Sequence, residues 1–128
     1  MTNTTENTVL HRMSDAINAH DVDAIVNCFT SDYQGEQPLY PESSFIGIAQ
    51  VRENWTDLFA QVPDLRATLV ASTVHDDFAW AEWHWQGTRT SGSALNLRGV
   101  TVSGLRDGIM AWAKIYMEPI HYQCSTAS

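Results

Sequence analysis

Residues 78–87 read Phe-Ala-Trp-Ala-Glu-Trp-His-Trp-Gln-Gly and sort into two different faces. One face carries Ala79, Ala81, Trp83 and Trp85, and the other carries Trp80, Glu82, His84 and Gln86. Such strict alternation is typical of a β-strand, whose successive side chains point to opposite sides of a sheet. Because both faces carry indoles, both have to be at least partly covered. We expect a curved sheet with a pocket on its concave face and a partner on its convex face.

Three helices are expected before this strand. Residues 8–20 repeat apolar side chains at helical spacing, Asp21 is an N-cap candidate for a short second helix that ends near 30–32, and a third helix spans about 48–59 before Pro63. The segment 33–44 contains Gly35, Pro38 and Pro41, so a strand fragment or irregular loop is expected there.

Four strands are expected at 65–73, 78–86, 95–105 and 109–118, joined by turn-forming sequences at 75–77, 91–93 and 106–108. Short links of this kind imply an antiparallel meander. The order of elements predicts an α+β fold: a cone in which three N-terminal helices pack on a strongly curved antiparallel sheet and enclose a hydrophobic pocket. We expect a single domain over 1–128, with a core of about 9–119 and tails at 1–7 and 120–128.

The composition of the chain argues against some classes of binding partner. With 15 acidic and 7 basic residues the chain has a formal charge of −8, which argues against binding to nucleic acid or to anionic membranes. Cys28 and Cys124 have no metal-ligand spacing and indicate reduced thiols in the cytoplasm. No apolar stretch is long enough to span a membrane. The histidines show no metal-binding spacing, so we expect neither a metal nor a cofactor.

Several motifs together resemble the nuclear transport factor 2-like superfamily, in particular its SnoaL-like branch. They are residues 19–25 (Ala-His-Asp-Val-Asp-Ala-Ile) with Phe29 and Asp32, the helical run 49–55, and residues 107–111 leading into 116–119. That branch includes polyketide cyclases, limonene epoxide hydrolase and ketosteroid isomerase. The resemblance implies the cone fold, but not one function, because the superfamily mixes enzymes with binding proteins.

The resemblance also places the catalytic acids of relatives, and this chain lacks them. Ile115 stands where the last strand of the cyclases and epoxide hydrolases carries an aspartate. In Arg98-Gly99-Val100 the arginine of their Arg-x-Asp motif survives and the aspartate does not. The isomerases, in which the protein environment tunes carboxyl pKa values, would need a base near Gln37, a tyrosine near Met13 and an acid near Val100.

The resemblance assigns faces in agreement with the alternation. The expected cavity residues are Ala79, Ala81, Trp83, Trp85, Arg98, Val100, Val102, Ala113, Ile115 and Met117, with Trp55 and Phe59 on the helical wall. The expected convex residues are Trp80, Glu82, His84, Trp112, Lys114, Tyr116 and Glu118. Exposed aromatics among charges suit an interface, so we expect a homodimer through the convex face.

Four residues are candidates for acid/base chemistry. Arg98 would polarise an oxygen, while Glu36, or His84 together with Glu118, would move a proton. The alternatives are that an acid of the 33–40 segment neutralises Arg98, and that His84 and Glu118 form a structural pair at the interface.

The ligand-binding candidates share an apolar or aromatic character, and they favour a flat hydrophobic ligand. Tyr33 and Tyr40 are possible hydrogen-bond donors to a ligand oxygen. The other candidates are Trp55, Phe59, Trp83, Trp85, Val100, Ile115 and Met117.

Two functions remain open. The first is a cofactor-independent enzyme that cyclises, isomerises or opens an epoxide of a hydrophobic cyclic metabolite. The second is a non-catalytic dimer that binds a hydrophobic ligand or acts as a scaffold. The ionisable groups inside the cavity distinguish them, because an enzyme needs at least one beside the ligand.

Overall fold

The computed structural model describes residues 8–120. The predicted tail 1–7, nearly all of the predicted tail 120–128, and Cys124 lie outside the described residues. The helices are α1 (Val9–Asn18), α2 (Val22–Val26) and α3 (Ile48–Gln61), with a 3-10 turn at Pro41–Ser43. The strands are β1 (Phe29–Glu36), β2 (Phe45–Ile46), β3 (Arg66–His75), β4 (Phe78–Thr88), β5 (Ala94–Arg106) and β6 (Ile109–Pro119). Three helices and one curved sheet confirm the α+β prediction.

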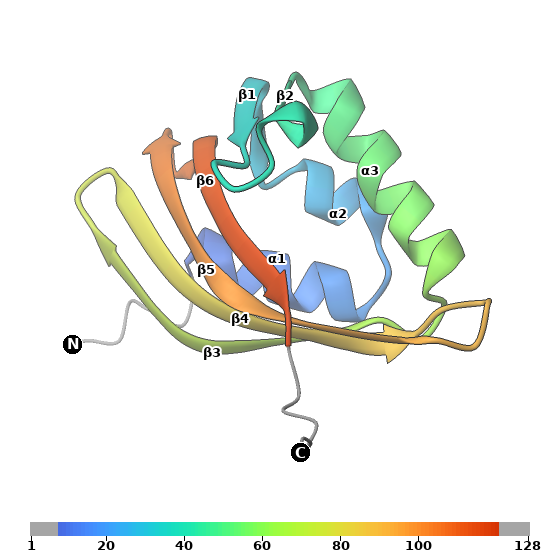
Figure 1. Ribbon diagram of the computed structural model, residues 1–128. Coiled ribbons are helices and arrows are strands. Elements are labelled where there is room, and N and C mark those ends of the chain that lie inside the picture. The colour runs from blue at the N-terminus through green and yellow to red at the C-terminus, as the bar shows by residue number, and fades with distance from the viewer. Residues whose placement is uncertain (1–7, 121–128) are drawn as a thin grey trace.

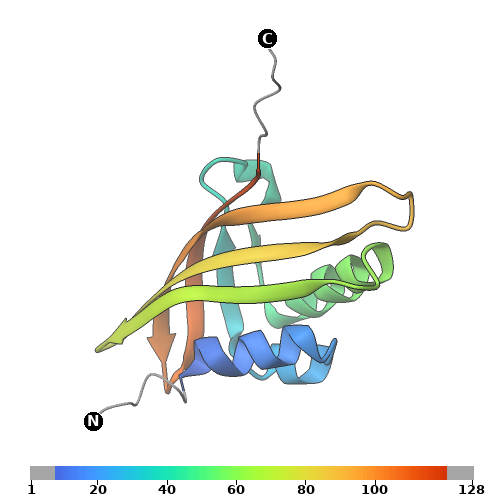
Figure 2. The ribbon, with the colours of Figure 1, turned by 90° about the horizontal axis from the view of Figure 1, so that it is seen from below.

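The six strands form one mixed sheet in the order β2-β1-β6-β5-β4-β3. Strands β3 to β6 are antiparallel neighbours, as the turn sequences predict. The sheet curves, and the three helices lie on its concave side (Figures 1 and 2).

Strand β1 departs from the prediction. It pairs parallel with β6 and antiparallel with β2, so the sheet is mixed and not purely antiparallel. It begins at Phe29, where the sequence predicts helix as far as 30–32. The Met110 amide donates to the Cys28 carbonyl just before the strand, and this long-range pairing with β6 overrides the local helical pattern.

Local chemistry accounts for the helices. The Thr8 side chain accepts a hydrogen bond from the His11 amide at the start of α1, and Asp21 caps α2 by accepting from the Ala24 amide, as predicted. Asn18 fastens the end of α1 to the edge strand β3. Its amide nitrogen donates to the Ala67 carbonyl at 2.9 Å and its oxygen accepts from the Ala67 amide at 2.7 Å.

Gly99 allows β5 to approach β6 closely. A Cβ at this position would collide with the Tyr116 carbonyl oxygen and lie 2.7 Å from the Met117 Cα. Because these are backbone atoms of the neighbouring strand, they cannot move aside as a flexible side chain would. Glycine is therefore required at the middle of the sheet.

The convex face of the sheet carries Trp80, Trp112 and Tyr116, as predicted, together with Phe78, which the prediction does not name. Phe78, Trp80 and Tyr116 are 56%, 41% and 37% exposed. The Trp112 ring lies over Gly104 and meets the Phe78 ring edge-on, with centroids 6.1 Å apart. Whether a second copy covers this convex face stays a prediction.

Light scattering tests the predicted homodimer. Twice the chain mass of 14.3 kDa is expected in solution, because exposed aromatics on one sheet face favour association. Trp80→Glu would place an unpaired charge in the interface and give a monomer, whereas Ala60→Glu, on the exposed side of α3, would leave the mass unchanged. A monomeric mass for the native chain would contradict the prediction.

Candidate functional site

A cavity of about 460 Å³ lies between the helices and the concave face of the sheet. Its size is within the range of small-molecule sites. Its lining is mostly apolar and comes from both layers: Leu10, Met13, Phe29, Tyr33, Gln37, Phe45, Val51, Asn54, Trp55, Asp57, Leu58, Gln61, Trp83, Trp85, Leu97, Thr101, Ser103, Met110, Ala113, Ile115 and Met117.

Three tryptophans form one connected wall. Trp83 and Trp85 alternate inward along β4, and Trp55 faces them from α3. The ring centroids are 5.3 Å apart for Trp55 and Trp85 and 6.2 Å apart for Trp83 and Trp85. The Trp83 Nε1 donates to the Thr101 Oγ1 at 3.2 Å, which fixes that indole against β5. The wall is therefore a broad aromatic surface held by packing.

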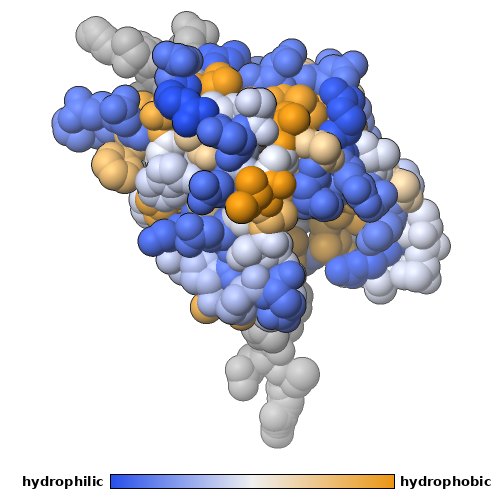
Figure 3. All heavy atoms as spheres, turned by 90° about the horizontal axis from the view of Figure 1, so that it is seen from above, coloured by the Kyte–Doolittle hydropathy of each residue, from blue (hydrophilic) through white to orange (hydrophobic). Residues whose placement is uncertain are grey.

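The mouth of the cavity is polar. Asn54, Asp57 and Gln61 line the cavity and are also exposed, so they mark its opening along one edge of α3. Seen from above, the surface has a hollow with hydrophobic atoms inside it and hydrophilic side chains around it (Figure 3). A polar rim around an apolar interior suits a ligand that enters from water.

Only two residues of the described lining, Asp57 and Tyr33, carry an acidic group, and none is Lys, Arg or His. Asp57 is the carboxylate at the mouth. Tyr33 is 3% exposed and packs against the rings of Phe29 and Phe45, at centroid distances of 4.6 and 5.9 Å. Burial raises the pKa of the Tyr33 phenol well above its ordinary value. Tyr33 is therefore a neutral hydrogen-bond donor over the physiological range.

Six of the predicted ligand-binding residues line the cavity: Tyr33, Trp55, Trp83, Trp85, Ile115 and Met117. Phe59 is outside the lining; it stacks on His20 with centroids 4.5 Å apart and supports Trp55 from behind at 5.8 Å. The roles of these residues in binding stay predictions.

The predicted inward orientation of Arg98, Val100 and Val102 is wrong. In β5 the lining comes from Leu97, Thr101 and Ser103, so the even-numbered residues lie on the convex face. There the Arg98 Nη2 is 3.6 Å from the Glu82 Oε2, and both side chains are partly exposed. A neutralising acid is the alternative that the sequence leaves open for Arg98, although the acid comes from β4 and not from the 33–40 segment.

His84 and Glu118 lie on the convex face as predicted, but they do not form the expected pair. Both are in register with Arg98, so strand β5 separates them. The His84 Nε2 is 2.6 Å from the Asn96 Oδ1. The Glu118 Oε1 accepts from the Tyr40 hydroxyl at 3.1 Å, and this hydrogen bond raises the pKa of Tyr40. Tyr40 is thus outside the cavity, contrary to the prediction.

Glu36 is exposed at the end of β1, in register with Lys114 of β6. It borders a second pocket with Ser44 and Ile46 and is not among the residues that line the cavity, although Phe45 lines both. Glu36 is thus not brought into the cavity, and its predicted catalytic role stays a prediction. The neighbouring Gln37 lines the cavity instead.

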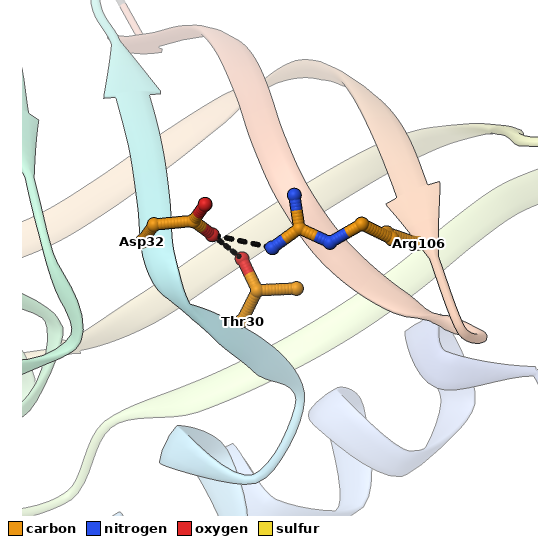
Figure 4. A network of polar contacts seen from close by, with 3 residues as sticks. All are labelled: Thr30, Asp32 and Arg106. Carbon is orange, nitrogen blue, oxygen red and sulfur yellow. Dashed lines mark hydrogen bonds and ion pairs between the residues drawn. The ribbon is translucent and has the colours of Figure 1, made fainter.

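Asp32, the other acid of this segment, belongs to a surface contact between β1 and the end of β5 (Figure 4). Its Oδ1 accepts from the Arg106 Nη2 at 2.6 Å and from the Thr30 Oγ1 at 2.8 Å. The hydrogen bond from Arg106 holds the pKa of Asp32 below its ordinary value. This network fastens two strands outside the cavity.

Sequence reasoning missed the polar part of the lining, namely Asn54, Asp57, Gln61, Thr101 and Ser103. The α3 residues follow one another at intervals of three and four positions, as Val51, Trp55 and Leu58 do, so the helical spacing could have placed them beside the apolar face. Within residues 8–120, no group of three His, Cys, Asp or Glu side chains is arranged to hold a metal ion. The described helices include none of sufficient length and apolarity to cross a membrane.

The model of the SnoaL-like domain family matches residues 10–113. The chain belongs to the SnoaL-like family. No curated protein is a significant match. Among solved structures, TsrD from Streptomyces laurentii is similar at 20% identity, with 92% of this chain and 91% of that chain covered and a TM-score of 0.77.

Two further structures agree with this fold. A hypothetical protein with a ketosteroid isomerase-like fold from Catenulispora acidiphila, in complex with trimethylamine, matches at 13% identity over 86% of this chain and 85% of that one, with a TM-score of 0.75. A putative SnoaL-like polyketide cyclase from Jannaschia sp. CCS1 matches at 19% identity over 86% of this chain and 83% of that one, with a TM-score of 0.72. At these identities the likeness concerns the fold alone.

The buried phenol of Tyr33 makes the stability of the fold fall in alkali. Above the ordinary tyrosine pKa of about 10 the unfolded chain loses a proton that folded Tyr33 keeps. The contribution of Tyr33 is therefore present below that pH and is lost above it, by about 1.4 kcal/mol per pH unit. Urea unfolding of the native chain and of Tyr33→Phe should show a steeper alkaline decline for the native chain. Parallel declines would contradict this prediction.

Proposed function

We propose that the SnoaL-like cavity binds a flat, mainly apolar, ring-containing small molecule that carries no negative charge. The observation that carries the proposal is the connected wall of Trp55, Trp83 and Trp85 beside about 460 Å³ of space. Aromatic rings stack on indoles with roughly 0.5–1.5 kcal/mol per pair beyond the burial of apolar area. A planar ring system uses such a wall better than a flexible chain does.

The charges of the lining support the same class of ligand. An anion would give up its hydration without meeting a Lys, Arg or His among the described lining residues, and it would pass Asp57 at the mouth. Desolvation of an unpaired anion costs several kcal/mol or more. With Arg98 on the convex face, the cation that the sequence predicts for polarising a ligand oxygen does not line the cavity.

The family agrees with this chemistry. The protein from Jannaschia is described as a putative polyketide cyclase, and a structure from Kribbella flavida as a putative ketosteroid isomerase. Steroids and the products of polyketide cyclisation both contain carbon rings. A cyclic metabolite of this kind is the ligand that we propose for this chain.

Calorimetric titration with α-tetralone, a bicyclic aromatic ketone, tests the proposal. Trp85→Ala removes a stacking surface from the cavity wall and should weaken binding about tenfold. Trp80→Ala removes an indole of the same strand from the convex face and should leave affinity unchanged. Equal weakening by both variants, or no binding to the native chain, would contradict the proposal.

Acid/base catalysis on the bound ring compound is the second candidate function. The observation that favours it is the presence of two dissimilar acids in one cavity: a carboxylate at the mouth, Asp57, and a buried protonated phenol, Tyr33. Cyclisation, isomerisation and epoxide opening all require a proton to move. Asp57 is the proton acceptor in this proposal, in place of Glu36, His84 and Glu118, and no cofactor takes part.

Hydrogen–deuterium exchange tests the catalytic candidate. In heavy water the Asp57 carboxylate would take a proton from the carbon next to the carbonyl of α-tetralone, and solvent would return a deuteron. NMR should show faster exchange with the native chain than with Asp57→Asn, by about 10²-fold or more. Glu53→Gln, which removes an exposed carboxylate of α3 outside the cavity lining, is the matched control. Native exchange at the buffer rate would exclude this catalysis and leave the binding proposal intact.

A further inference from the structure

The Tyr33 hydroxyl is a hydrogen-bond donor that the protein does not use. Tyr33 lines the cavity and is 3% exposed, and the described residues provide ring contacts to it from Phe29 and Phe45 but no hydrogen bond to its hydroxyl. Among side-chain atoms of residues 8–120, the Trp85 Nε1 alone is both sealed from solvent and unpaired. The Tyr33 oxygen, which is also unpaired, must therefore keep accessible surface. Tyr33 lines the cavity, so the cavity is the space available to this surface.

The other hydroxyl and indole groups of this region differ from Tyr33. The Trp83 Nε1 is bonded to Thr101, and the Ser103 hydroxyl donates to the Met110 Sδ at 3.6 Å. The Trp85 Nε1 is unpaired but sealed, so a ligand cannot reach it without rearrangement. Tyr33 is the group that combines burial of its ring with an open hydroxyl.

Buried polar groups in proteins are nearly always hydrogen-bonded, and leaving one unpaired costs roughly 1–3 kcal/mol. The phenyl rings beside Tyr33 offer no strong acceptor. A pure hydrocarbon ligand would displace water from this hydroxyl without offering a hydrogen-bond acceptor in its place. A ligand with an acceptor oxygen at that place would replace the lost water.

We infer that Tyr33 determines specificity: its hydroxyl donates to an uncharged acceptor oxygen, such as a ketone or quinone carbonyl, and so selects oxygenated ring compounds over the matching hydrocarbons. This inference rests on the proposed function, since it concerns the ligand of the same cavity. It adds that the ligand presents an uncharged acceptor oxygen to Tyr33.

The test compares α-tetralone with tetralin, the same bicycle without the carbonyl oxygen. Both are titrated into the native chain and into Tyr33→Phe, and the ratio of the tetralin Kd to the ketone Kd is taken for each protein. Differences in hydration between the two compounds cancel between proteins. The ratio should fall about fivefold in Tyr33→Phe, as expected for one neutral hydrogen bond.

Tyr116→Phe is the matched control, because it removes the same hydroxyl group from the convex face. It should leave the ratio at its native value. An unchanged ratio in Tyr33→Phe would overturn the inference while the binding proposal stands. If neither compound binds the native chain, the proposed function fails and the inference fails with it.

A second measurement on the native chain does not depend on how Tyr33→Phe folds. The carbonyl stretch of bound α-tetralone should lie at lower frequency than in a hydrocarbon solvent, because a hydrogen bond weakens the C=O bond. A hydrocarbon-like frequency in the native complex would overturn the inference whatever the variant does.

Discussion

The inner face of β4 sets the shape of this fold. Ala79 and Ala81 are sealed, at 1% and 0% exposure, whereas Trp83 and Trp85 farther along the strand line the cavity. The side chains on this strand face thus become larger along β4. The alanines allow close packing, and the tryptophans present broad rings to the cavity. Trp55 of α3 meets these rings, so helix and sheet contact each other through indoles at this end. The same residues complete the core and build the wall of the candidate site.

The spacing of apolar residues predicts much of this architecture, because the residues that repeat at helix or strand spacing are also the buried ones. In α1 the five apolar positions Val9, Leu10, Met13, Ala16 and Ile17 are all buried. The faces of β4 and β6 also follow the alternation. Strand β1 is not predicted in full, because its partners β6 and β2 are distant in sequence and no local pattern encodes a parallel pairing.

In β5 the positions of the valines predict the wrong inward face. Val100 and Val102 face outward while Thr101 and Ser103 face the cavity. The inward hydroxyls are tolerated because Thr101 accepts from Trp83 and Ser103 donates to Met110. Leu95, which is buried, and Leu97, which lines the cavity, are the residues that indicate the correct phase.

This one-residue shift changes the chemistry of the candidate site. It moves Arg98 out of the cavity and into a row with His84 and Glu118 on the convex face. Met13, Gln37 and Ile115, the positions to which the resemblance assigns acids or a phenol in relatives, line the cavity and carry no such group. The polar groups of the lining are then Tyr33, Gln37, Thr101 and Ser103 in the interior and the α3 residues at the mouth.

Ligand binding in the cavity is tested most directly by NMR of the indole N–H groups of the five tryptophans during titration with α-tetralone. Three lie on the cavity wall, Trp55, Trp83 and Trp85, and two lie on the convex face, Trp80 and Trp112. We expect the three cavity resonances to shift together and saturate while the other two stay in place. Shifts confined to Trp80 and Trp112, or no saturable shift at all, would contradict this expectation.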